Sequence, residues 1–231
     1  MSSIGNPILL ENKSENEYIT YTRCLFAFTE TVKIASLLAR GETLENIHDL
    51  VLRKDLLQVR SLASRKSSLR IILKRLNSLS APYIQFIASD HIDVQRLTIF
   101  WTILREHRLL RELIREVIIE KLYRLERVIS DRDLQDFFLT KYEQQEAIKS
   151  WSESTYQKTA SHIVTTLVRA GLLYPIQYRK QYEIRPAPLP RELRDQLIAD
   201  GWEHYLLLML DFHHLHQVTA RALNTASMGS V

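Results

Sequence analysis

The sequence predicts a mainly all-α protein. Only five glycines and six prolines occur in 231 residues, too few for the tight turns of sandwiches and barrels or for glycine-rich phosphate loops. Apolar residues instead recur at helical spacing along most of the chain. The proportions of hydrophobic (45%) and charged (25%) residues are those of an ordinary soluble globular protein, long enough for one large domain or two small ones.

Several helices are expected in the N-terminal half. The segment 18–39 has helical periodicity and is followed by Gly41, a stop signal, and Thr43 can cap a short helix over 44–52. A further helix is expected to begin at Ser64 or Ser67, with an apolar stripe made of Leu69, Ile72, Leu73, Leu76 and Leu79. After residues 80–90, a long helical stretch over about 91–127 is expected to bend near its REHR motif.

The helical periodicity resets near residue 130, where Ser130 or Asp133 can cap a new helix. This reset predicts two domains, 1–129 and 130–231. The second domain is expected to contain helices over about 131–139, 142–150 and 155–169, a two-stranded ribbon over 174–186, and a last helical portion over 190–200 and about 202–223.

The helix over 155–169 is the first candidate binding element. Ser154 and Gln157 have the spacing of a capping box, and Gly171 is a favourable C-terminal stop. A helical wheel predicts a buried face made of Tyr156, Ala160, Ile163, Val164, Leu167 and Val168. The opposite face has short polar side chains and cations but no acid, namely Lys158, Ser161, His162, Thr165 and Arg169.

Three helices followed by two strands are the order of elements in a winged helix-turn-helix, whose third helix enters a DNA major groove. Short polar side chains fit that groove, and cations at its edges reach phosphates. Arg179 and Lys180 are expected at the tip of the ribbon, where they can contact the DNA backbone. The alternatives are a merely solvated polar face and a winged helix that binds only protein.

The segment 53–75 is the second candidate. It contains eight basic residues and one acidic residue, and the basic ones are Arg53, Lys54, Arg60, Arg65, Lys66, Arg70, Lys74 and Arg75. Such a one-sided cluster favours an anionic partner. Because aromatic residues are not interleaved with the cations, the pattern favours duplex backbone over single-strand stacking. The alternatives are a solvated basic face and a patch covered by acids such as Glu11, Glu15, Glu17 or Glu30.

Common catalytic motifs are absent from the sequence, including GxGxxG, the P-loop, HExxH, GxSxG and CxxC. Asp131, Asp133 and Asp136 could indicate a metal-dependent nuclease, but helix capping explains them more simply. The histidines of the DFHHLH motif, residues 211–216, lack a second ligand cluster. Cys24, the single cysteine, is expected to be buried. The sequence therefore offers no catalytic motif, and no metal, cofactor or small-molecule substrate is expected.

The sequence shows neither a signal peptide nor an apolar run near the roughly 20 residues that span a membrane. A cytoplasmic protein is therefore expected, without a membrane partner.

Several of these segments together resemble the BrxA family of BREX phage-defence systems. The resemblance covers about residues 18–200, and its most specific part consists of Phe137, Phe138, Trp151, Ser152, Thr155, Leu167, Gly171, Leu172 and Leu173. It implies a non-enzymatic protein that binds double-stranded DNA, with a NusB-like N-terminal half and a winged-helix-like C-terminal half. It also implies other BREX components as partners: a methyltransferase, an ATPase and a phosphatase-like protein.

The leading hypothesis is thus a DNA-binding accessory protein that uses the basic segment for phosphates and the 155–169 helix for groove contact. The alternative is a protein-interaction scaffold of the same defence complex without direct DNA contact. An RNA-binding factor, suggested by the NusB-like fold, is weaker because a fold alone does not define a function.

Overall fold

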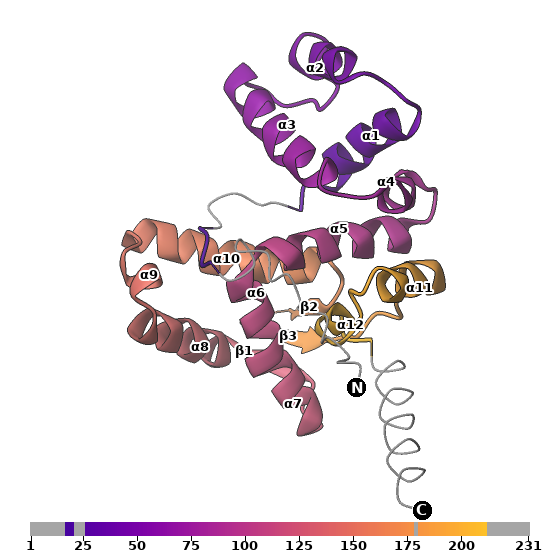
Figure 1. The fold of residues 1–231 in the computed structure, drawn as a ribbon. Coiled ribbons are helices and arrows are strands. Elements are labelled where there is room, and N and C mark those ends of the chain that lie inside the picture. The colour runs from indigo at the N-terminus through magenta and orange to yellow at the C-terminus, as the bar shows by residue number, and fades with distance from the viewer. Residues whose placement is uncertain (1–16, 21–25, 178–179, 212–231) are drawn as a thin grey trace, which may run out of the picture.

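The computed structural model describes residues 17–20, 26–177 and 180–211, and these are mainly helical (Figure 1). The helices of the first half are α1 (Phe28–Ala39), α2 (Leu44–Leu52), α3 (Leu62–Leu76), α4 (Ala81–Ala88), α5 (Ile92–Glu106), α6 (Arg108–Leu113), the π-helical η2 (Ile114–Ile119) and α7 (Glu120–Tyr123). The second half contains β1 (Val128–Ser130), α8 (Asp131–Gln144), α9 (Glu146–Lys149), α10 (Glu153–Arg169), β2 (Leu173–Ile176), β3 (Gln181–Ile184), α11 (Arg191–Ala199) and α12 (His204–Leu208).

The first half packs α1 against α3, α4 and α5, with α2 against α3 (Figure 1). Its apolar stripes meet in a core whose fully buried members include Ile34, Ile72 and Ile87. The predicted cap at Thr43 is confirmed, because its side chain accepts the Asn46 N–H at 3.2 Å.

Three expectations for this half are wrong in detail. The helix expected from residue 18 begins only at Phe28, because residues 18–20 are not helical and Ala27 has a left-handed φ of 31°. The third helix starts at Leu62 because Ser61, not Ser64 or Ser67, accepts the first free N–H group. Residues 81–88, to which the sequence analysis assigned no element, form α4.

The long helical stretch is broken where the REHR motif predicts it. His107 is extended, with φ −118° and ψ 93°, so α5 ends at Glu106 and α6 begins at Arg108. The helix α5 is buried along most of its length, and Figure 1 shows it between the first half and the helices of the second. This central helix therefore serves as the common core of the described chain.

The second half contains three helices as expected, but α8 continues to Gln144 instead of ending near 139, and α9 covers only Glu146–Lys149. The sheet has three strands instead of two. β1 pairs antiparallel with β3, and β3 pairs with β2, giving the order β1-β3-β2. β1 escaped prediction because three residues are too short for a period-two pattern to be recognised. The predicted domain boundary after residue 129 falls inside this strand.

The ends of two helices show how the sequence positions them. Ser130 caps α8 in a full capping box with Asp133. For α10 the cap is Ser152, which accepts the Thr155 N–H, and not the predicted Ser154. Gly171 follows α10 with φ +78°, a conformation that glycine adopts without strain.

The helices α11 and α12 pack back onto the first half (Figure 1). Tyr83 of α4 donates a hydrogen bond to Asp200 at 2.8 Å, and Trp101 of α5 contacts Trp202 edge-on at 6.3 Å. The guanidinium of Arg105 lies over both tryptophan rings, at 5.1 and 4.7 Å from their centres. The helix expected from Trp202 to about Leu223 is wrong in its bounds. The helix α12 covers only His204–Leu208, because Leu210 has a left-handed φ of 60°, and residues 212–223 lie outside the described ranges.

Candidate nucleic-acid interface

The cations of α3 that the sequence singled out fall into two groups. Lys66, Arg70 and Lys74 are exposed on one face of the helix, and Arg60 is exposed just before it. Arg70 and Lys74 lie one turn apart, opposite the buried Leu69, Ile72 and Leu76. These side chains form a row of accessible positive charge along α3.

The end of α2 adds two more cations beside this row. Arg53 and Lys54 both lie near Asp49, at 3.3 and 3.8 Å. Their side chains remain 86% and 66% exposed, so these ion pairs are weak and can rearrange when another anion approaches. We call Arg53, Lys54, Arg60, Lys66, Arg70 and Lys74 the α3 patch.

Arg65 does not belong to this patch, which corrects the sequence prediction. Its guanidinium binds Asp55 at 2.9 Å and donates to the carbonyl oxygens of Leu52 and Val59. The side chain is only 18% exposed. Arg65 therefore holds the loop between α2 and α3 in place and is committed to internal contacts.

Arg75 is the second correction, since only 1% of it is exposed. It follows Ile72 by three residues, so it lies on the flank of the apolar stripe and turns inward. Burial, together with the positive charges of Arg75, Arg111 and Lys74, holds the pKa of the buried His107 well below its ordinary 6.5. Arg75 is part of the interior near the α5–α6 bend and is not accessible to a phosphate.

The helix α10 is rotated about its axis relative to the predicted wheel. Its buried residues are Thr159, Ile163, Thr166 and Leu167. Neither Thr159 nor Thr166 was assigned to the predicted apolar face, but Thr166 satisfies its hydroxyl by donating to the His162 carbonyl at 2.9 Å. The buried face of α10 therefore includes two threonines and differs from the face that the helical wheel predicts.

The predicted polar strip of α10 is therefore accessible only in part. Lys158, Ser161 and Arg169 are exposed, whereas His162 and Thr165 are half-buried. The Thr165 hydroxyl donates to the Ser161 carbonyl at 2.8 Å, within the helix. Lys158 lies in the first half of α10, and Arg169 is its last residue.

The rotation also exposes apolar side chains that were expected in the core. Tyr156, Ala160, Val164 and Val168 are partly exposed and line a groove of about 870 Å³ between α8 and α10. The opposite wall includes Leu134, Phe138, Leu139 and Tyr142 of α8. We call this hollow the α8–α10 groove.

At the β2–β3 turn, Lys180 is exposed, with its ammonium 4.0 Å from the carboxylate of Asp131. Arg179 lies outside the residues that the structure describes. Arg185, which the sequence analysis did not single out, lies over the Tyr174 ring at 4.4 Å and pairs with Glu183. Hydrogen bonding to Arg185 lowers the pKa of the Glu183 carboxyl, so this pair stays ionised at neutral pH.

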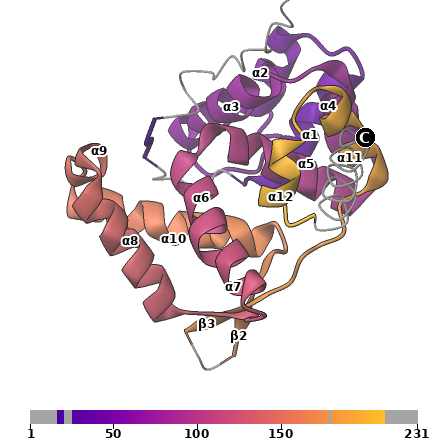
Figure 2. The same cartoon turned by 60° about the horizontal axis from the view of Figure 1, so that its bottom comes forward.

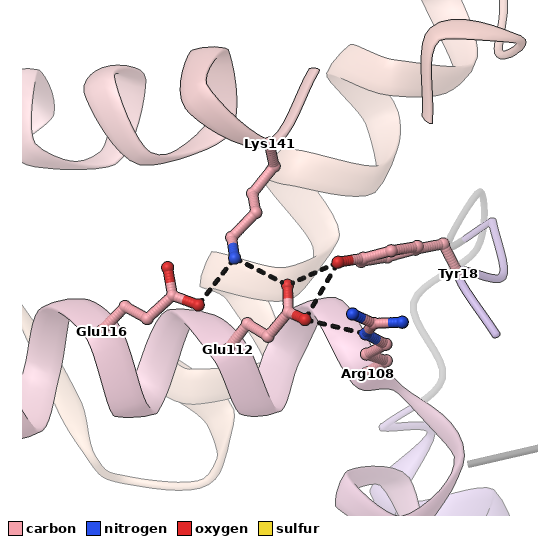
Figure 3. A network of polar contacts seen from close by, with 5 residues as sticks. All are labelled: Tyr18, Arg108, Glu112, Glu116 and Lys141. Atoms are coloured by element: carbon pink, nitrogen blue, oxygen red, sulfur yellow. Dashed lines mark hydrogen bonds and ion pairs between the residues drawn. The ribbon is translucent and has the colours of Figure 1, made fainter. Parts of the chain in front are cut away.

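A buried polar network fixes α8 to the long helical stretch (Figure 3). The ammonium of Lys141, whose side chain is 8% exposed, lies 2.9 Å from Glu112 and 2.6 Å from Glu116. Arg108 donates to Glu112 at 2.8 Å, and the Tyr18 hydroxyl donates to the same carboxylate at 2.9 Å. Four side chains from three segments of the chain thus meet around Glu112.

The electrostatics of this network favour its charged form. Burial alone would raise the pKa of Glu112, but hydrogen bonds from Arg108, Lys141 and Tyr18 hold it below its ordinary value. Burial opposes the charge on Lys141, and its two carboxylate partners outweigh that effect and raise its pKa. The network therefore positions α8, and with it one wall of the groove, relative to η2.

The aspartates that could suggest a nuclease have structural contacts instead. Asp133 completes the capping box and pairs with Lys121 at 3.1 Å, while Asp136 faces Arg132 at 3.6 Å. Within residues 17–20, 26–177 and 180–211, no three histidine, cysteine or carboxylate side chains group as metal ligands do. Of the DFHHLH motif only Asp211 lies in these ranges, and it pairs with Arg194. None of the helices described is both long and apolar enough to cross a bilayer.

With this geometry in place, comparison with known proteins is informative. The sequence model of the BrxA family matches residues 18–201, which is most of the chain. The chain belongs to the BrxA family. A curated relative, "BREX protein BrxA" of Bacillus cereus, is 27% identical to it over 146 residues, which cover 63% of this chain and 73% of the relative.

The BrxA-family chain also resembles a solved structure. A crystal structure of an uncharacterized protein from Magnetospirillum magneticum superposes with a TM-score of 0.64 at 17% identity. The match covers 81% of this chain and 96% of the other. At this identity the likeness shows a shared fold and carries no functional argument.

Proposed function

We propose that this BrxA-family protein is a non-enzymatic, double-stranded-DNA-binding accessory protein of a BREX bacteriophage-resistance system. The observation that carries the proposal is the α3 patch. Its cations are exposed, and the only ion-pair partner identified for them within the described residues is Asp49. Accessible cations on α3 and on the segment before it can neutralise backbone phosphates and release counterions.

In this proposal α10 is the groove-binding helix of a winged helix, and the β2–β3 turn is its wing. The order α8, α9, α10, β2, β3 and the antiparallel sheet support it. Lys158 and Arg169 would contact phosphates, and Ser161 would face base edges. The carboxylates of Asp131, Asp136 and Glu153, which line the α8–α10 groove, would repel a duplex from that side.

We further propose that other BREX components are partners of the protein. This rests on the family to which the chain belongs and on the name of its Bacillus cereus relative. A scaffold without DNA contact is the competing function, and a duplex titration separates the two.

The titration follows the anisotropy of a fluorescent duplex of about 25 base pairs over a series of salt concentrations. Replacing Lys66, Arg70 and Lys74 together by glutamine removes up to three phosphate contacts, so the slope of log K against log [salt] should become shallower by about 2 to 3. Arg191→Gln is the matched control, since it removes an 88%-exposed cation on α11, outside the α3 patch. An unchanged slope in the triple variant would place the phosphate contacts outside the α3 patch, and no duplex binding by the unaltered protein would assign it to the scaffold class.

The contribution of α10 is measured with the same duplex. Lys158→Gln should weaken binding several-fold whatever the duplex sequence, because a phosphate contact carries no sequence information. Ser161→Ala should instead change the ranking among duplexes of different sequence. If neither variant alters binding while the triple variant does, the DNA is held by the α3 patch alone.

A further inference from the structure

The α8–α10 groove is lined by two facing rows of side chains, whose floor on α8 is formed by the buried Leu134 and Phe138 and whose α8 wall exposes Leu139 and Tyr142. On α8 the row is Leu134, Phe138 and Tyr142, and on α10 it is Tyr156, Ala160, Val164 and Val168. Members of each row are four residues apart, which is the spacing of the ridges that helices use to pack against one another. Leu139, at the lip, is 52% exposed.

The two helices meet only near α9 and diverge from there (Figures 1 and 2). Close aromatic contacts are found at the α9 end, where the Tyr142 and Tyr156 rings are 5.5 Å apart and the Phe138 and Tyr156 rings 6.5 Å. Toward the sheet the walls separate, and Pro175 and Tyr182 form the far end of the groove. The space between the rows is therefore shaped like a slot that accepts an elongated body.

The length of the slot indicates what fits it. Lining residues extend from Asp131 to Tyr142 on α8 and from Glu153 to Val168 on α10. At 1.5 Å per residue these stretches are about 17 and 22 Å long. A helix of about 11 to 15 residues has the same length, and its apolar face would pack between both rows.

The negative charge around the slot favours a helix with basic side chains. Asp131, Asp136 and Glu153 line the groove, and no lysine or arginine is among its described lining residues. The segment 131–157 contains six acidic and three basic residues, and one of the three, Lys141, is engaged in the buried network around Glu112. Arg132 and Lys180 lie beside two of the carboxylates but are 88% and 87% exposed, so these pairs are easily displaced.

We propose that the α8–α10 groove is the docking site for a basic amphipathic helix of a partner protein. Apolar residues of that helix would pack against Leu139 and Tyr142 on one side and Val164 on the other, and its lysines or arginines would meet the rim carboxylates. This site is separate from the α3 patch, so the proposal does not depend on duplex contact by that patch. Ser161 lines the groove, so a docked helix and base contact by Ser161 would compete.

The test uses two fluorescent, end-capped peptides of about 14 residues, with leucine at the i, i+3, i+4 and i+7 positions. One peptide has lysine at the remaining positions and the other has glutamate. At about 50 mM salt the lysine peptide should bind the full-length protein at least 10-fold more tightly, and salt near 500 mM should reduce that preference. Equal affinities of the two peptides would overturn the proposal.

Variants locate the binding. Asp136→Asn combined with Glu153→Gln should weaken the lysine peptide about 5-fold or more, and these rim positions are exposed enough to spare the fold. Leu139→Ala should weaken it several-fold, whereas Leu62→Ala, which removes an equally exposed leucine (51%) on α3, should leave it unchanged. Equal effects of the two leucine variants would show that the peptide binds elsewhere.

Two further measurements distinguish the other occupants. Sedimentation of the protein alone should show a monomer. If it shows self-association instead, Ala160→Trp, which fills the middle of the α10 row, tests whether the groove is the contact. Such an association would replace the partner helix with a second copy of the chain. Leu139→Ala should leave duplex affinity unchanged, so failure of the docking proposal and failure of DNA binding give different results.

Discussion

Lys141 offers the most direct test of how the fold is held together. In the variant Lys141→Met the aliphatic part of the side chain is kept and the ammonium is lost. Glu112, whose side chain is 11% exposed, then loses a partner at 2.9 Å, while Glu116, at 45% exposure, can regain water. Breaking a buried ion pair typically costs 3–5 kcal/mol. Because Arg108 and Tyr18 still satisfy Glu112, we expect a loss of about 2–3 kcal/mol near neutral pH.

The assay is urea unfolding followed by far-ultraviolet circular dichroism. Lys149→Met is the matched control, since Lys149 pairs with Glu146 at 2.6 Å but is 38% exposed, and it should cost less than about 0.5 kcal/mol. The contribution of Glu112 to stability requires its charge, because its pKa is lowered on folding. That contribution is present above its ordinary 4.5 and is lost as the pH falls through the lower folded value.

The cost of Lys141→Met should therefore shrink under acid conditions, where the carboxyl left behind is neutral. A Lys141→Met variant as stable as the Lys149→Met control near neutral pH would refute the reasoning. A cost that did not change on acidification would show that the loss came from packing instead of charge.

Three further predictions concern stability. Since the pKa of His107 is lowered on folding, the unfolded chain binds a proton there that the folded chain does not, and stability should fall by up to about 1.4 kcal/mol per pH unit below 6.5. His107→Leu should flatten that slope in unfolding curves recorded between about pH 5 and 6.5, and an unchanged slope would place the effect at other groups. Gly171→Ala should lower thermal stability by at least about 1 kcal/mol, because φ is +78° and a Cβ would lie 3.2 Å from the Arg96 guanidinium. If no stability is lost, the end of α10 relaxes without strain. Ser130→Ala removes half of the α8 capping box with Asp133 and should cost about 1 kcal/mol in the same thermal unfolding experiments. The control Ser154→Ala should have no measurable cost, and equal costs for the two variants would contradict the observed cap.

The sequence alone determined most of the secondary structure. Regular apolar spacing and local caps such as Thr43 and Ser130 fix where helices run, because these signals depend only on near neighbours in the chain. The break at residue 107 and the helix end at Gly171 could be predicted from the sequence for the same reason. The family resemblance found in the sequence is confirmed by the match over residues 18–201. DNA binding and the residues that carry it stay predictions.

Only the tertiary structure decided which side of each helix faces inward and which cations remain accessible. The helical wheel assigned Thr159 and Thr166 to neither face, yet both are buried in α10, and the Thr166 hydroxyl donates within its own helix. Arg65 and Arg75 belong to the same basic segment as Arg70, yet Arg65 pairs with Asp55 in the loop and Arg75 is buried in the interior. Helical periodicity specifies the angle between side chains on one helix, but the direction of the core is set by the other elements that pack against it. The α8–α10 groove also depends on tertiary packing, because the distance between the two helices that form its walls is not specified by any local sequence pattern.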